Sequence, residues 1–162
     1  MNTTTTDRPA VSSSLESRIL REGYGPGAWH GADFKAALAD VTPALAFKRP
    51  AAGRHNIAEV ALHHAYCTRA VTAQLSGSDE PFVMEGEDWF ELSGEKTMAW
   101  PKVQATVSSY HEKLAEAVAG IEAGTKSSPL EDAERFNLVL GITCHAVYHA
   151  GQIQLIKKLL GA

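Results

Sequence analysis

The 162-residue chain has few cysteines, few aromatic residues and no long apolar run. Its two cysteines, Cys67 and Cys144, are too few for a disulfide framework, so we expect two free thiols in a reducing compartment. The N-terminal residues Met-Asn-Thr-Thr-Thr-Thr-Asp-Arg-Pro lack the apolar core of a signal peptide. No stretch approaches the length needed to span a bilayer. These absences predict a soluble, cytoplasmic protein without a membrane partner.

An excess of positive charge is also missing. Fifteen basic residues stand against 19 acidic ones, which gives a formal net charge of −4, and no basic run occurs. Nucleic acids and anionic membranes attract basic surfaces, so neither is an expected partner. A small molecule fits this charge balance better.

Helical periodicity dominates the chain, and no clean alternating run indicates a strand. We expect a loose Thr/Ser-rich tail over residues 1–13 and a single all-α domain over 14–162. A short helix should begin at Ser14 and end at the glycine-rich segment 23–27. A four-helix bundle should follow, with helices at 32–41, 57–75, 97–121 and 130–160. The long segment 76–96 reads as a loop whose aromatic residues could cover a pocket.

Two histidines mark the last predicted helix. His145 and His149 are four residues apart, so their imidazoles lie on one face and can bind a single ion. The same face carries apolar residues at steps of three and four, which predicts that it points into the bundle. The alternative is a pair of histidines satisfied by hydrogen bonds or partly exposed, and His30, His55 and His111 fit that alternative.

The helix predicted at 57–75 carries the adjacent pair His63 and His64, after an Asn56–Glu59 capping-box pattern. Periodicity places His64 closer to the inward face than His63. One histidine from this helix and two from the last would leave a coordination position open, as in catalytic metal sites. Three imidazoles suit zinc, nickel, copper or iron.

Several stretches resemble the DinB-like superfamily of metal-binding four-helix bundles, which includes YfiT-like proteins and thiol-dependent transferases. They are Gly27-Ala28-Trp29-His30-Gly31, Ile57-Ala58-Glu59-Val60-Ala61-Leu62-His63, Trp100, and His145-Ala146-Val147-Tyr148-His149-Ala150-Gly151-Gln152-Ile153. The resemblance implies that His63, His145 and His149 hold a divalent cation, often nickel or zinc. His64 occupies a position that the family usually fills with an apolar residue, so it is an alternative ligand.

The resemblance also implies a function. The leading hypothesis is a metal-dependent thiol S-transferase or hydrolase-like enzyme with a low-molecular-weight thiol as cosubstrate, the metal lowering the pKa of that thiol. The alternative is a non-enzymatic, stress-induced protein that binds a metal or small ligand. A DNA-acting protein is disfavoured by the acidic charge balance.

The last predicted helix carries more apolar side chains than one core stripe requires, namely Val139, Leu140, Val147, Leu155 and Leu159. Surplus apolar surface predicts an interface, and a two-fold homodimer is the commonest closed assembly. The alternative is that the short N-terminal helix covers this surplus within one chain.

Overall fold

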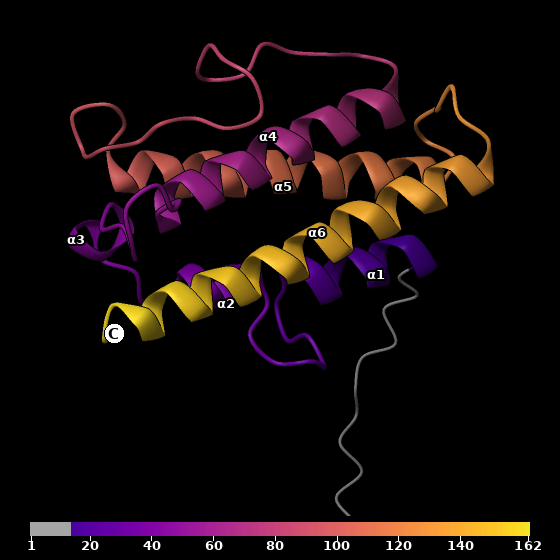
Figure 1. Cartoon of the computed structure of the whole chain (residues 1–162). Helices are drawn as coiled ribbons and strands as arrows, with labels where there is room; N and C mark the ends of the chain where they lie inside the picture. The colour runs from indigo at the N-terminus through magenta and orange to yellow at the C-terminus, as the bar shows by residue number, and fades with distance from the viewer. Residues whose placement is uncertain (1–13) are drawn as a thin grey trace, which may run out of the picture.

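The computed structural model describes residues 14–162, and the tail predicted at 1–13 lies outside this range. Within the described range the chain forms six helices and no strand, which confirms the all-α prediction. The helices are α1 (Leu15–Tyr24), α2 (Phe34–Leu38), α3 (Pro43–Ala46), α4 (Ile57–Ser76), α5 (Trp100–Glu122) and α6 (Asp132–Leu159) (Figure 1). No helix in residues 14–162 has the length and apolar character needed to cross a bilayer.

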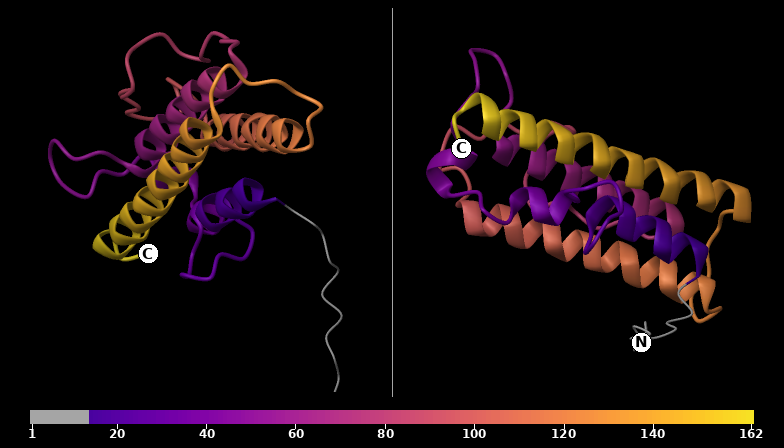
Figure 2. Two further views of the ribbon diagram at one scale, coloured as in Figure 1. Left: turned by 90° about the vertical axis from the view of Figure 1, so that its right-hand side faces the viewer. Right: turned by 90° about the horizontal axis from the view of Figure 1, so that it is seen from below.

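Three long helices, α4, α5 and α6, form most of the bundle, and α1 and α2 together occupy the fourth position. Both short helices pack against α6, and α1 also contacts α5. Figure 2 shows them side by side with α6 and α5 when the bundle is seen from below. The helix predicted at 32–41 therefore supplies only part of the fourth side, and the N-terminal helix supplies the rest.

The helix predicted at 32–41 is wrong in length, because α2 has only 5 residues. Its start is well defined, since the Asp33 carboxylate accepts a hydrogen bond from Ala36 N at 2.9 Å. Thr42 then caps α3 and precedes Pro43, and a residue before proline is pushed out of the helical region. The buried Lys157 of α6 donates to the Ala37 carbonyl and pairs with Asp40, so it satisfies the C-terminal end of α2.

A glycine lets α1 approach α6 closely. A Cβ at Gly23 would lie 2.9 Å from the Thr143 carbonyl oxygen and 3.0 Å from the Ala146 Cβ. Contacts this short are not tolerated, so a side chain at position 23 would force the helices apart. The contact lies in the turn of α6 that carries His145.

The predicted capping box at the start of α4 is confirmed. The Asn56 side chain accepts from Glu59 N at 2.9 Å, and the Glu59 carboxylate accepts from Asn56 N at 3.3 Å. The helix ends at Gly77, which has a left-handed φ of 69° that glycine adopts without strain. These caps fix the part of the chain that carries His63 and His64.

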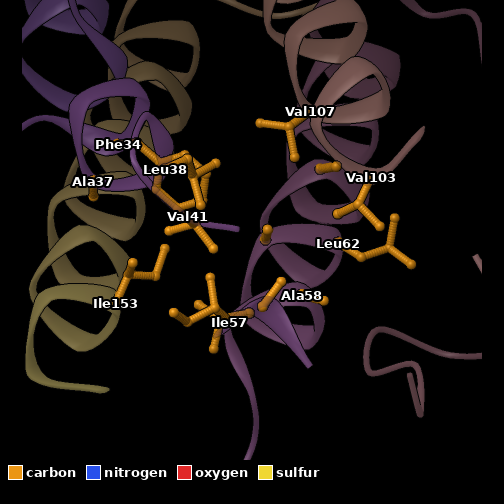
Figure 3. Close-up of a cluster of buried hydrophobic side chains, with 14 of the residues drawn as sticks. Phe34, Ala37, Leu38, Val41, Ile57, Ala58, Leu62, Val103, Val107 and Ile153 are labelled. Atoms are coloured by element: carbon orange, nitrogen blue, oxygen red, sulfur yellow. The ribbon is translucent and has the colours of Figure 1, made fainter. Parts of the chain in front are cut away.

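The core consists of two clusters of buried apolar side chains. The first joins α2, α4, α5 and α6, and Figure 3 labels these members: Phe34, Ala37, Leu38, Val41, Ile57, Ala58, Leu62, Val103, Val107 and Ile153. The second lies toward α1 and contains Leu20, Leu75, Leu114, Val118, Val139 and Ile142. Full burial of one such aliphatic side chain contributes about 1.5–3 kcal/mol. The imidazole of His64 packs against Phe34 of the first cluster and lines a small cavity together with Leu20, Leu114 and Ile142 of the second.

The segment between α4 and α5 is a long loop, as predicted, and it runs along α4 (Figure 1). Its C-terminal part is held at Leu92, whose carbonyl accepts from Asn56 Nδ2 at 2.7 Å and whose N–H donates to Glu59 at 3.0 Å. Phe90 and Leu92 are buried in the first cluster. The loop is therefore anchored beside the histidine-bearing face of α4.

Candidate metal centre

The bundle brings together three histidine side chains from two helices. Nε2 of His145 lies 3.1 Å from Nε2 of His63 and 3.0 Å from Nε2 of His149. Candidate ligand atoms of all three residues lie within 4.8 Å of one another. Two nitrogens bound to one ion at about 2.1 Å are about 3.0–3.4 Å apart for angles between 90° and 109°. The nitrogens of His145 are thus spaced from those of its neighbours as ligands of one ion would be.

Outer partners fix the orientation of two of these rings. Nδ1 of His63 lies 2.8 Å from the Asp88 carbonyl oxygen, and Nδ1 of His149 lies 2.6 Å from Oε1 of Gln152. Gln152 in turn donates from Nε2 to the Tyr148 hydroxyl at 3.0 Å. Because carbonyl oxygens only accept, both rings carry a hydrogen on Nδ1, and their neutral forms present the Nε2 lone pair to the cluster.

The adjacent histidine His64 lies outside this group of three. It is 3% exposed, and its Nδ1 is 3.0 Å from Nδ1 of His145, on the side of that ring away from the converging Nε2 atoms. His63 is also buried, at 6% exposure. Periodicity therefore placed His64 inward correctly, while the side chain of α4 whose Nε2 contacts Nε2 of His145 at the candidate centre is that of His63.

Burial keeps the α6 histidines neutral. Burial, followed by the neighbouring His149 and His63, lowers the pKa of His145 to about 4. Burial also lowers the pKa of His149, although the hydrogen bond to Gln152 acts in the opposite direction. Near pH 7 both rings therefore present lone pairs rather than positive charge. Converging lone pairs repel one another unless a cation or proton lies between them.

A tryptophan of the loop between α4 and α5 covers one side of the centre. The Trp89 indole lies between two imidazoles, with centroid distances of 3.9 Å to His63 and 3.8 Å to His55 and interplanar angles of 2° and 11°. Trp89 remains 37% exposed. The expectation that loop aromatics cover a pocket is met at this position, and His55 has a structural role as the outer ring of the stack.

Beneath this stack, Glu59 connects three parts of the chain. Its buried carboxylate accepts from Arg49 through both guanidinium nitrogens, from Leu92 N at 3.0 Å, and lies 3.0 Å from Nδ1 of His55. Burial acts to raise the pKa of Glu59, but the hydrogen bonds from Arg49, Leu92 and His55 outweigh burial and hold this pKa below its usual range. The sequence showed the capping role of Glu59 but gave no signal for Arg49, which precedes the helix by several residues. A cavity of about 460 Å³ adjoins this group and is lined by Arg49, Gly53, His55, Glu59, Trp89, Phe90 and Glu91.

The two cysteines are free thiols, as expected. Sγ of Cys67 lies 3.8 Å from Nε2 of His63, and burial, with a smaller effect of Asp88, raises the pKa of this thiol to about 11. Cys144 is exposed. His30 and His111 lie apart from the group of three. Nε2 of His30 lies 2.7 Å from the Glu22 carbonyl oxygen, and the His111 ring stacks on Tyr24.

An all-α bundle in which imidazoles from two facing helices converge defines a class of helical proteins with a candidate metal centre in the core. The family model of the DinB superfamily matches residues 28–153, and the chain belongs to this superfamily. This match spans α2 to most of α6 and includes all three histidines. Neither the comparison with curated proteins nor that with solved structures found a match.

Proposed function

We propose that this chain is a divalent-metal-dependent enzyme that acts on a small molecule, either as an S-transferase with a low-molecular-weight thiol or in a hydrolase-like reaction with water. His63, His145 and His149 would hold the ion. One observation carries this proposal: the Nε2 atoms of the three rings converge, while a partner engages the other nitrogen of each ring. Those partners are the Asp88 carbonyl, His64 and Gln152.

The donor set fits a borderline transition metal. Neutral imidazole nitrogens suit zinc and nickel, and three protein ligands leave a position for a thiol or a water molecule. When bound, such a cation lowers the pKa of a coordinated thiol or water, so that thiolate or hydroxide is present near neutral pH.

The residues around the centre would orient and protect the reacting groups. The Asp88 carbonyl and the Gln152–Tyr148 pair hold two ring planes, and Trp89 excludes water from one face of His63. In the metal-free chain burial raises the pKa of the Cys67 thiol to about 11, which disfavours its thiolate as a nucleophile competing with an added thiol. In S-transfer the thiolate sulfur forms a bond to an electrophilic carbon, and the leaving group departs with its electron pair.

The second candidate function is non-enzymatic binding of a metal or small ligand. Its support is the close stacking of Trp89 on His63, which covers one side of the centre. Both candidate functions require a bound metal ion at this centre, and they differ in whether the protein turns over a substrate.

The test uses the full chain loaded with nickel or zinc, with glutathione and chlorodinitrobenzene as probe substrates. We expect metal-dependent conjugation that is lost in His149→Ala and retained in the matched control His30→Ala, because His30 lies outside the group of three. If the chain binds one metal ion but neither conjugates glutathione nor hydrolyses an activated ester, the result would favour the non-enzymatic binding protein. Absence of bound metal after loading, measured by atomic emission, would contradict both functions.

A further inference from the structure

The imidazole of His64 makes a close and enclosed contact with that of His145. Their Nδ1 atoms are 3.0 Å apart, and His64 is only 3% exposed. Phe34 packs against the His64 ring with the centroids 4.3 Å apart, which limits its movement. Two ring nitrogens at this distance share one hydrogen, so one ring donates and the other accepts.

Thr68 identifies the acceptor. Its hydroxyl donates to the His64 backbone carbonyl at 2.8 Å, which leaves the hydroxyl oxygen as an acceptor toward the ring. This oxygen lies 3.5 Å from Nε2 of His64. A neutral His64 therefore places its hydrogen on Nε2, and its Nδ1 accepts from His145.

The direction of this hydrogen bond decides what His145 presents to the centre. With the hydrogen on Nδ1, Nε2 of His145 directs a lone pair to the point it shares with His63 and His149, 3.1 and 3.0 Å away. The reverse direction would place a hydrogen on Nε2 and prevent this ring from binding an ion. His145 is the middle ligand, so its tautomer determines whether the group of three can act together.

We propose that His64 is a positioning residue for the metal centre: it accepts a hydrogen bond from Nδ1 of His145 and so holds that ring in the tautomer whose Nε2 can bind a divalent cation. This inference rests on the proposed metal-dependent function. It assigns a role to a histidine at a position where an apolar side chain would be sufficient for packing against Phe34.

The first measurement is nickel binding to the full chain at pH 7.5 by calorimetry. His64→Leu keeps bulk but removes the acceptor, and we expect one nickel per chain with affinity about 10–100-fold weaker, the usual loss for such a partner. His64→Asn offers a side-chain oxygen near the position of Nδ1 and should recover most of this affinity. Thermal unfolding of the metal-free variants checks that each is folded.

The second measurement is the ¹⁵N spectrum of the imidazole nitrogens in the zinc-loaded chain, because without a cation a hydrogen on Nε2 of His145 would relieve the repulsion among the three lone pairs. We expect the hydrogen of His145 on Nδ1 and that of His64 on Nε2, with a coupling between the two Nδ1 atoms across their hydrogen bond. A merely structural role for His64 would give no such coupling.

The outcomes distinguish the positioning role of His64 from the proposed metal-dependent function. A zinc-loaded parent chain without this coupling, or equal nickel affinity in His64→Leu, overturns the positioning role. Loss of the stoichiometric site in His64→Leu without recovery in His64→Asn also overturns it, because His64 would then be a ligand. If nickel affinity depends on His64 as expected but the loaded chain turns over neither probe substrate, the proposed enzyme function fails and the positioning role stands. A parent chain that binds neither nickel nor zinc overturns both.

Discussion

The indole of Trp89 and the imidazole of His63 lie parallel, with ring centroids 3.9 Å apart and planes 2° from one another. Trp89 belongs to the loop between α4 and α5, whereas His63 belongs to α4. A metal ion on His63 would therefore lie close to a fluorescent group that is also partly exposed to solvent.

We predict that nickel quenches the tryptophan fluorescence of the chain through Trp89. Of the three tryptophans, Trp89 is the one stacked on a histidine of the candidate centre, while Trp29 is 93% exposed and Trp100 is buried and donates to the Val41 carbonyl. Titration of Trp89→Phe should show little quenching although nickel still binds. Equal quenching in this variant and the parent chain would place the ion elsewhere.

Alanine substitutions should identify the ligands. His63→Ala, His145→Ala and His149→Ala each leave two imidazoles of the three, so we expect most bound metal to be lost. His111→Ala removes a half-buried histidine stacked on Tyr24; it is the control and should retain the metal. Atomic emission after dialysis measures the ratio of metal to chain. Full retention in any of the three variants would exclude that residue as a required ligand.

Glu59 should make stability depend on acid pH. Its folded pKa is lowered, so the carboxylate contributes stability that is fully present above its ordinary pKa of 4.5 and is lost as pH falls through the lower folded value. At pH 7, Glu59→Gln should lower the free energy of unfolding by about 1–3 kcal/mol, because Arg49 and Leu92 N lose a charged acceptor.

Urea unfolding at pH 7 and near pH 3 measures this effect. The difference between parent and variant should shrink at the lower pH, because below 4.5 the unfolded chain takes up a proton at Glu59 and the stabilising effect of the lowered folded pKa declines. A difference that stays constant over this range would show that the charge of Glu59 is not the stabilising feature.

We also predict a homodimer through the exposed face of α6. Leu140, Tyr148, Leu155 and Leu159 are 40–65% exposed, and residues 136–156 contain no Asp, Glu, Lys or Arg. Val139, expected on this surplus face, is instead buried against α1 with Leu20. The N-terminal helix thus covers part of the apolar surface of α6. The exposed side chains from Leu140 to Leu159 remain uncovered, and a second copy of the chain would cover them.

Light scattering at micromolar concentration should give twice the chain mass of 17.4 kDa. Leu155→Lys should shift the mass toward the monomer, whereas Leu15→Lys, on an exposed leucine of α1, should not. A parent chain of monomer mass would reject the dimer.

The parts of the centre that periodicity could predict lie on helices. His145 and His149 follow from their spacing, and the inward direction of His64 follows from the pattern of α4; the choice of His63 required the family motif. Trp89 and Asp88 could not be found in this way, because a loop has no period that fixes where a side chain or a carbonyl points. The Arg49–Glu59 pair depends on how the chain folds back, and sequence spacing carries no such information.

Sequence spacing does not show where the chain turns, and this also explains why the length of α2 was overestimated. Apolar residues at 34, 38 and 41 share a helical face, but Thr42 and Pro43 begin a new helix and the chain turns before Val41 can continue the old one. Val41 is still buried in the first core cluster, so the apolar pattern correctly marked burial and overestimated helix length.

The hydrogen bond from His63 to the Asp88 carbonyl joins the centre to a segment without helices or strands of its own. Binding of a cation at this imidazole would therefore be linked to the ordering of the loop, and whatever favoured one would favour the other to the same extent in free energy. A cation on His63 would lower the conformational entropy of the loop between α4 and α5, and a substrate that displaced Trp89 would weaken metal affinity in return. Ion affinity and access for a small molecule would thus oppose each other.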